Sequence, residues 1–132
     1  MSFNVGAALA VFLAASAAPG EPGTVTPAAV QAMVPVVAPA QVKAMIAAHA
    51  KFMLVDVRNP DEFAAGHIDG AMLMPLGTLE TAYKTLPRDI KLVVYCHSGH
   101  RSAQAVAFLQ AHGFARAVSM DGGITAWNAL PQ

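Results

Sequence analysis

The chain is poor in the residues that build disulfides, metal sites and charged binding surfaces. It has one cysteine in 132 residues, and only 12% of its residues are charged. A single cysteine excludes an internal disulfide and a structural zinc site made of several thiolates. The formal net charge is zero, so nothing favours electrostatic binding to nucleic acid or to an acidic membrane surface. The length suits one domain with a core of ordinary size.

The N-terminal part of the chain has almost no charge. Before Lys43 the only charged side chain is Glu21, and the run from Val5 to Ala18 is small and apolar apart from Ser16. This run is too short to span a bilayer comfortably. It ends in Ala-Ser-Ala at 15–17, which fits the cleavage site of a secretory signal peptide, although no Lys or Arg precedes the run.

We therefore predict a signal peptide over 1–17, a linker rich in Pro and Gly over 18–35, and one domain over 36–132. The expected location is periplasmic or secreted, with no stable membrane insertion after cleavage of the signal peptide. A cytoplasmic protein, or one anchored to a membrane through 1–18, remains the alternative.

Apolar runs and helical patterns alternate along the predicted domain. Strands are expected at 36–37, 52–56, 71–74, 92–95 and 117–120, and helices from 39, near 59–63, and over 78–86, 102–112 and 124–130. The strands are continuously apolar, which is typical of a parallel sheet buried on both faces. We predict an α/β fold with a central parallel sheet of about five strands and helices on both faces.

The only cysteine stands at the end of one of these strands. In a parallel sheet, ligand sites lie beyond the carboxyl ends of the strands, and both Asp56 and Cys96 end an apolar run. The loop after Cys96 leads into a helix predicted from about Ser102, and backbone N–H groups at such a place stabilise thiolates and bind anions. The candidate site is Cys96, His97, Ser98, Gly99, His100, Arg101 and Ser102.

The neighbours of the cysteine favour a reactive thiol over a small buried hydrophobe. Gly99 permits a tight turn, and Arg101 presents a planar fork that suits a tetrahedral oxyanion. His97 and His100 add polarity, and no carboxylate or second thiol lies nearby in sequence to complete a metal site with them. We expect Asp56 to pair with a cation such as Arg58 and to support the site.

Three stretches together resemble the rhodanese (thiosulfate sulfurtransferase) family. The loop CHSGHRS at 96–102 is similar to the family's active-site loop. The stretch LVDVRNPDEFAAGHIDGA at 54–71 is similar to its first motif, and DGGITAW at 121–127 to its closing Gly-Gly-x-x-x-Trp motif. The three occur in the family's order, and the resemblance covers roughly 36–130.

The resemblance implies the rhodanese fold and sulfur transfer. Cys96 would attack the outer sulfur of thiosulfate, release sulfite and pass the sulfur from a persulfide to cyanide or a thiol acceptor. The N–H groups from His97 to Ser102 would stabilise the anionic terminal sulfur, and Arg101, helped by His100, would hold the sulfonate oxygens. The family chemistry needs no metal and no organic cofactor. Glu62, His67 and Trp127 are expected to have structural roles, and Gly122-Gly123 to form a turn.

Two other functions remain open at this stage. Dual-specificity phosphatases that share the fold place five residues between Cys and Arg, whereas four separate Cys96 from Arg101, so we expect the tighter loop to disfavour a phosphatase or arsenate reductase. A rhodanese-like module that carries sulfur or binds another protein is the second alternative. Inactive modules usually lack the cysteine, which this chain keeps.

Overall fold

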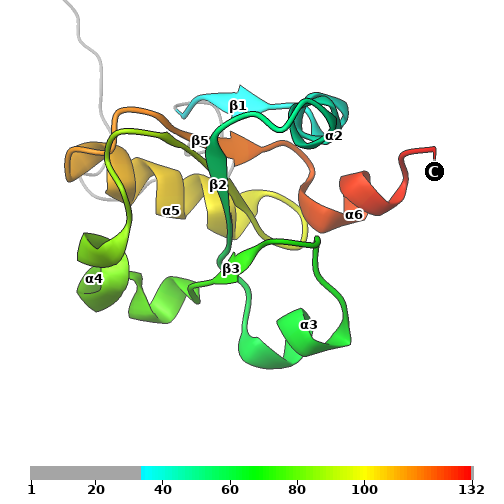
Figure 1. Cartoon of the computed structure of the whole chain (residues 1–132). Coiled ribbons are helices and arrows are strands. Elements are labelled where there is room, and N and C mark those ends of the chain that lie inside the picture. Colours follow the sequence, from blue (N-terminus) through cyan, green and yellow to red (C-terminus); the bar gives the residue numbers. More distant parts are fainter. Residues whose placement is uncertain (1–33, 132) are drawn as a thin grey trace, which may run out of the picture.

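The computed structural model describes residues 34–131, so the predicted signal peptide over 1–17 and nearly all of the predicted linker lie outside the described residues. Five strands alternate with helices (Figure 1). The strands are β1 (Val36–Val37), β2 (Phe52–Asp56), β3 (Met72–Leu73), β4 (Lys91–Tyr95) and β5 (Ala117–Met120). The α-helices are α2 (Pro39–Ala47), α3 (Pro60–Ala65), α4 (Leu79–Ala82), α5 (His100–Ala111) and α6 (Gly123–Asn128).

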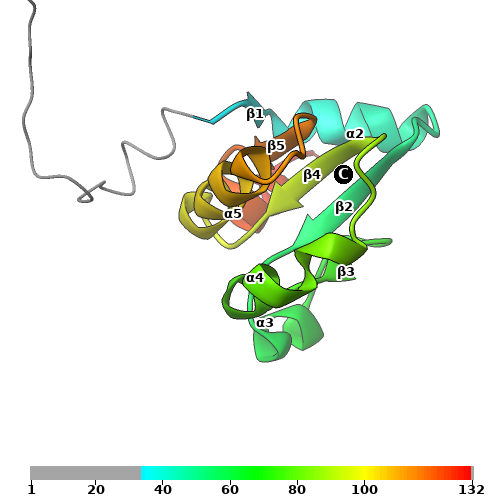
Figure 2. The same cartoon turned by 90° about the vertical axis from the view of Figure 1, so that its left-hand side faces the viewer.

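All five strands form one parallel sheet in the order β1-β5-β4-β2-β3. The central strands β2 and β4 pair along their whole length, from Phe52 opposite Lys91 to Asp56 opposite Tyr95. Figure 2 shows the sheet with α5 and α2 on opposite sides of it. The prediction of a parallel sheet of about five strands with helices on both faces is confirmed.

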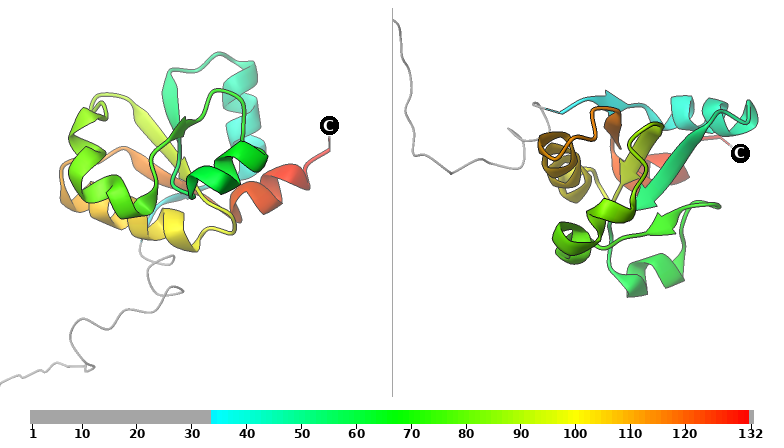
Figure 3. Two further views of the ribbon diagram at one scale, coloured as in Figure 1. Left: turned by 90° about the horizontal axis from the view of Figure 1, so that it is seen from below. Right: turned by 60° about the vertical axis from the view of Figure 1, so that its left-hand side comes forward.

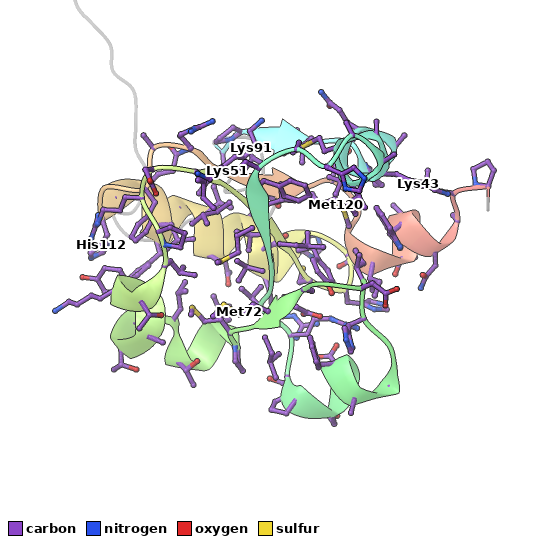
Figure 4. All side chains as sticks on the ribbon, viewed as in Figure 1. Lys43, Lys51, Met72, Lys91, His112 and Met120 are labelled. Atoms are coloured by element: carbon purple, nitrogen blue, oxygen red, sulfur yellow. The ribbon has the colours of Figure 1, made fainter. Side chains whose placement is uncertain are left out.

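Each face of the sheet has its own hydrophobic core, because successive side chains of a strand point to opposite faces. Leu92, Val94 and Cys96 face α4 and α5, whereas Val93 and Tyr95 face α2 and α6. Figure 3 shows these two layers from two further directions, and Figure 4 shows the side chains that fill them. The α3 helix, which follows β2, lies at the carboxyl edge of the sheet and buries none of its residues.

Several predicted boundaries were wrong, and the early start of α5 has a clear physical reason. The helix predicted from about Ser102 begins at His100, because Gly99 adopts a left-handed conformation and its carbonyl accepts the first helical hydrogen bond from Ala103 N. The helix expected over 78–86 is a four-residue α4 between two 3₁₀ turns, Leu76–Thr78 and Tyr83–Thr85. The strand expected over 71–74 pairs only at Met72–Leu73, and the helix expected over 124–130 is Gly123–Asn128.

No helix within residues 34–131 has the length and apolar character needed to cross a membrane. The location of the protein stays a prediction, because it depends on the N-terminal residues.

One buried hydroxyl ties the sheet to the segment that precedes β3. Tyr95, at the end of β4, is fully buried, and its hydroxyl oxygen accepts the Ile68 N–H at 3.1 Å. Burial raises the pKa of this phenol, an effect that the hydrogen bond from Ile68 opposes only in part. The ring also lies 5.7 Å from the guanidinium carbon of Arg58. Tyr95 thus joins the core to the residues at the carboxyl edge of the sheet.

We predict that Tyr95→Phe lowers the free energy of unfolding by about 1–3 kcal/mol, because it leaves the buried Ile68 N–H without an acceptor. Urea denaturation followed by circular dichroism measures this change. Tyr83→Phe is the matched control, since the Tyr83 hydroxyl makes no hydrogen bond to the rest of 34–131, and it should leave stability nearly unchanged. Equal effects of the two substitutions would show that the hydroxyl of Tyr95 contributes nothing specific.

Candidate functional site

The sulfur of the only cysteine lies under a tight loop and receives two backbone hydrogen bonds. Cys96 follows β4 directly and is 1% exposed. Its Sγ accepts the N–H of Gly99 at 3.0 Å and the N–H of Ser102 at 3.3 Å. Backbone donors aimed at a sulfur from the first turn of a helix stabilise negative charge on it. Two such donors, on Gly99 and Ser102, meet the Cys96 sulfur.

A pair of buried serines lies behind the cysteine. The Ser102 hydroxyl is 3.6 Å from the Cys96 sulfur, donates to the Gly99 carbonyl at 3.2 Å and shares a 2.8 Å hydrogen bond with the Ser119 hydroxyl. Both serines are nearly inaccessible to solvent. Ser119 lies on β5, so the neighbouring strand supports the first turn of α5. The sequence reasoning did not single out Ser119.

The outer side of the loop is held by the start of α6. Ile124 N–H donates to the Cys96 carbonyl at 2.8 Å, and Thr125 N–H donates to the His97 carbonyl at 3.1 Å. In a trans peptide the N–H points opposite to the preceding C=O. The N–H groups of His97 and Ser98 therefore point away from α6. The predicted turn at Gly122-Gly123 thus serves to bring helical N–H groups onto the cysteine loop.

Gly123 is the place where α6 comes closest to this loop. A Cβ atom at Gly123 would lie 2.4 Å from the His97 carbonyl oxygen and 2.6 Å from that of Cys96. The residue also has a φ of +63°, a left-handed conformation that residues with a side chain rarely adopt. Both facts require glycine at this position.

Arg101 lies in the first turn of α5 and forms a two-pronged ion pair with Glu62 of α3. Its Nη1 and Nη2 donate to the two carboxylate oxygens of Glu62 at 2.8 and 3.0 Å. Glu62 Oε1 also accepts the N–H of Asn59. The guanidinium and this backbone N–H lower the pKa of Glu62 from 4.5 to about 2, so the carboxylate stays charged across the physiological range.

The pairing of Arg101 was not anticipated from the sequence. Arg101 was expected to hold an anion with its guanidinium fork, but in the structure the Nη1–Nη2 edge is occupied by Glu62. Its Nε makes no hydrogen bond to other described residues. Arg101 therefore presents one remaining donor edge in a fixed orientation, and about a third of its side chain is exposed.

The expected pair of Asp56 with Arg58 is confirmed. Asp56 is fully buried at the end of β2, and its two oxygens accept Arg58 Nε and Nη2 at 2.7–3.1 Å as well as the Arg58 N–H. Arg58 Nη2 also donates to the Gly66 carbonyl at 2.7 Å. The bond to Asp56 raises the pKa of Arg58. A buried charge pair with this many hydrogen bonds fixes the segment between β2 and α3.

The remaining predicted residues lie on the outside of the loop. His97, Ser98 and His100 are exposed, and His97 Nε2 lies 3.5 Å from the Thr125 hydroxyl. No group of three or more His, Cys, Asp or Glu side chains within 34–131 is arranged to hold a metal ion. His97 also lines a cleft of about 340 Å³ next to the loop, whose other walls include Arg58, Glu62, His67 and Trp127.

A model of the rhodanese-like domain family matches residues 38–130. A sulfurtransferase of Allochromatium vinosum is 41% identical over 75 residues, which cover 57% of this chain and 70% of that protein. The thiosulfate sulfurtransferase GlpE of Ectopseudomonas mendocina is 36% identical over 77 residues, 58% of this chain and 71% of the relative. A probable adenylyltransferase/sulfurtransferase MoeZ of Mycobacterium tuberculosis is 44% identical over 79 residues, which are only 20% of its length.

Solved structures agree with this match. A rhodanese-related protein from Thermoplasma volcanium is 34% identical, with a TM-score of 0.66 over 74% of this chain and 95% of that one. The human single-domain sulfurtransferase TSTD1 is 26% identical, with a TM-score of 0.67 over 74% of this chain and 98% of that one. A Rhodopseudomonas palustris protein described as a possible tyrosine phosphatase is 29% identical, with a TM-score of 0.70 over 83% of this chain and 95% of that one.

We predict that Gly123→Ala displaces the cysteine loop and destabilises the protein by at least about 1–2 kcal/mol, the cost of a left-handed conformation with a side chain, because the new methyl group would overlap two carbonyl groups of the loop. Thermal unfolding measures the loss of stability, and the rate of Cys96 alkylation by iodoacetamide reports on the loop. Gly77→Ala is the control, because a Cβ there meets no atom within 4 Å and the residue has no left-handed φ. Equal stability and equal alkylation in the two variants would contradict the prediction.

Proposed function

We propose, from the premise that this chain belongs to the rhodanese-like domain family, that it moves sulfane sulfur from thiosulfate, or a related donor, to an acceptor through a persulfide on Cys96. The observation that carries the proposal is the pair of backbone N–H groups, from Gly99 and Ser102, that meet the cysteine sulfur. Curated relatives that match more than half of the chain are sulfurtransferases, among them GlpE.

In the first half of the reaction, the Cys96 thiolate attacks the outer sulfur of thiosulfate. The bond between the two thiosulfate sulfurs breaks, its electron pair leaves with sulfite, and the enzyme keeps the outer sulfur as a persulfide. The negative charge then lies on a sulfur one bond further out. The N–H groups of the loop, held in direction by α6, are the donors that would meet that charge.

Arg101 would hold the sulfonate end of the donor. Glu62 occupies the Nη1–Nη2 edge of its guanidinium, so the donor oxygens would bind along the edge that includes Nε. The ion pair fixes the direction of a long, flexible side chain before substrate arrives. A donor placed in advance stabilises a developing charge without reorganisation during the reaction.

In the second half of the reaction, cyanide or a thiolate attacks the outer sulfur of the persulfide. The electron pair of the broken S–S bond returns to Cys96, and the thiolate is restored. Sulfur moves between two sulfur atoms, or from sulfur to carbon. The cycle therefore needs no external oxidant or reductant.

Phosphoryl transfer is the alternative suggested by the description of the Rhodopseudomonas palustris structure. A phosphoryl group needs donors for three equatorial oxygens around the attacked phosphorus. Here the N–H groups of Gly99 and Ser102 already lie on the sulfur itself at 3.0 and 3.3 Å. The short spacing between Cys96 and Arg101 supports the transfer of a single sulfur atom.

We predict that incubation with thiosulfate adds the mass of one sulfur atom to the protein, measured by intact mass spectrometry. Because the chain has a single cysteine, the added sulfur has one expected position, and Cys96→Ser should show no adduct. Cyanide added afterwards should remove the sulfur, and thiocyanate should form at the rate at which the adduct disappears.

Each alternative function has its own outcome in this experiment. Absence of an adduct on the wild-type protein would refute the persulfide. An adduct that cyanide and thiols fail to discharge would indicate a sulfur carrier that needs a protein partner. Hydrolysis of an aryl phosphate as fast as thiosulfate turnover would indicate a phosphatase.

We predict that Arg101→Ala raises the KM for thiosulfate about ten- to a hundredfold, because a hydrogen bond to a charged group contributes about 1.5–3 kcal/mol. Steady-state thiocyanate formation measures the effect. The variant should remain folded, since both members of the ion pair are partly exposed to solvent. Arg116→Ala, which removes an exposed arginine bonded to the Asp89 carbonyl, is the control, and an unchanged KM in Arg101→Ala would exclude the clamp.

A further inference from the structure

Charge is distributed unevenly between the two edges of the sheet, although the formal net charge of the chain is zero. At the carboxyl edge, Arg58 and Arg101 are both paired with carboxylates. Two exposed acidic residues also lie there, Asp61 in the first turn of α3 and Asp121 directly after β5. Within 34–131, the edge that holds the cysteine loop therefore has no Lys or Arg without an acidic partner.

The amino edge, the side of the sheet at which its strands begin, carries four cationic side chains. Lys51 directly precedes β2, Lys91 is the first residue of β4, and Arg116 directly precedes β5. Arg88 lies in the turn that leads into β4. None of the four forms an ion pair with another residue of 34–131, so their charges are balanced only by solvent and counterions.

The sheet brings these charges close together. Lys51 directly precedes the residue that pairs with Lys91, and the carbonyl of Arg116 accepts the N–H of the residue after Lys91 at 3.2 Å. Figure 4 shows Lys51 and Lys91 near each other. The turns at this edge hold two acidic residues, Asp69 and Asp89. Positive charge therefore predominates, and such a surface attracts anions even on a protein without net charge.

An exposed apolar side chain borders this edge. Ile46, in the last turn of α2, is 38% exposed. Together with Phe52 and Ile90 it lines a hollow of about 320 Å³. Phe52 directly follows Lys51, and Ile90 directly precedes Lys91, so the hollow adjoins two of the four cations. Lys and Arg beside exposed apolar side chains are typical of surfaces that lie in the headgroup region of anionic membranes.

The N-terminal residues join the domain from the same side. Because β1 is parallel to β5, the residues before Val36 lead toward the amino edge of the sheet. Residues 1–33 precede the described part of the chain and include the apolar run from Val5 to Ala18. A membrane that this run contacts would lie on the amino side of the sheet. This position favours a lipid surface over an acidic protein as the partner of the four cations.

We propose that the amino edge of the sheet binds the surface of a membrane that contains anionic phospholipids. The four cationic side chains contact the lipid phosphates, Ile46 contacts the headgroup region, and the cysteine loop faces the aqueous side. The contact is peripheral, and it is made by the folded domain as well as by the N-terminal residues. The cationic side chains that form it are Lys51, Arg88, Lys91 and Arg116.

The test measures binding of the full 132-residue chain to phosphatidylcholine vesicles with and without phosphatidylglycerol, by cosedimentation. We expect tighter binding to the anionic vesicles, and the difference should shrink at high salt. Binding to phosphatidylcholine alone measures the contribution of the apolar run.

Two substitutions at the amino edge separate its charge from the net charge of the protein. Lys51→Gln and Lys91→Gln should each weaken binding to the anionic vesicles about fivefold and leave binding to phosphatidylcholine unchanged. Neither lysine side chain is hydrogen-bonded to other described residues, so both variants should fold. Lys43→Gln is the matched control, because it removes the same charge from α2, away from the other two lysines (Figure 4). It should change binding less than about twofold.

Equal binding to the two kinds of vesicle would overturn the proposal, as would equal losses in Lys43→Gln and Lys91→Gln. Release from the vesicles by polyglutamate at a matching concentration of negative charge would also overturn it and would indicate an acidic protein as the partner. Cys96 is the only thiol and reports the orientation. A membrane-impermeant maleimide should modify it equally fast in bound and free protein, and protection by vesicles would contradict the proposed orientation. None of these measurements depends on sulfur transfer.

Discussion

The site depends on backbone hydrogen bonds that meet the cysteine loop from both of its sides. On the buried side, the N–H groups of Gly99 and Ser102 donate hydrogen bonds to the Cys96 sulfur. From outside, the first N–H groups of α6 hold the carbonyls of Cys96 and His97. A loop between a strand and a helix has no sheet partner to define its peptide planes. Here α6 fixes the peptide planes by hydrogen bonds to the carbonyls of Cys96 and His97. Because α6 must come close to the loop to form these bonds, there is no room for a side chain at Gly123.

Two ion pairs complete this arrangement without leaving a net charge at the edge of the sheet. Asp56 with Arg58 is buried and fixes the segment between β2 and α3. Glu62 with Arg101 is partly exposed and joins that same segment to the first turn of α5. Each arginine is bound by its carboxylate along one edge only. The carboxylates therefore fix the orientation of the two guanidinium groups.

The helices, the strands and the position of the cysteine loop could be predicted from the sequence, but the contacts between distant segments could not. Continuous apolar runs that alternate with helical patterns imply a covered parallel sheet, and a strand that ends in Cys96 places the thiol at its ligand edge. The start of α5 was missed by two residues, because a left-handed Gly99 at the N-cap is not evident from the pattern.

The pair of Glu62 with Arg101 joins residues 39 positions apart. Glu62 lies three residues after Asn59, which indicates a helix start and nothing about Arg101. Ser119 had a weak signal, as a polar residue within the apolar run of β5.

The early start of α5 bears on the chemistry. Because the helix begins at His100, only His97, Ser98 and Gly99 form the loop proper, and Arg101 and Ser102 belong to the first helical turn. The geometry of the first helical turn therefore positions the Ser102 N–H that donates to the sulfur, and the turn at Gly99 positions the other donor. Both donors, from Gly99 and Ser102, meet the Cys96 sulfur itself. The proposal that the short spacing between Cys96 and Arg101 suits a single sulfur atom better than a tetrahedral anion rests on this geometry.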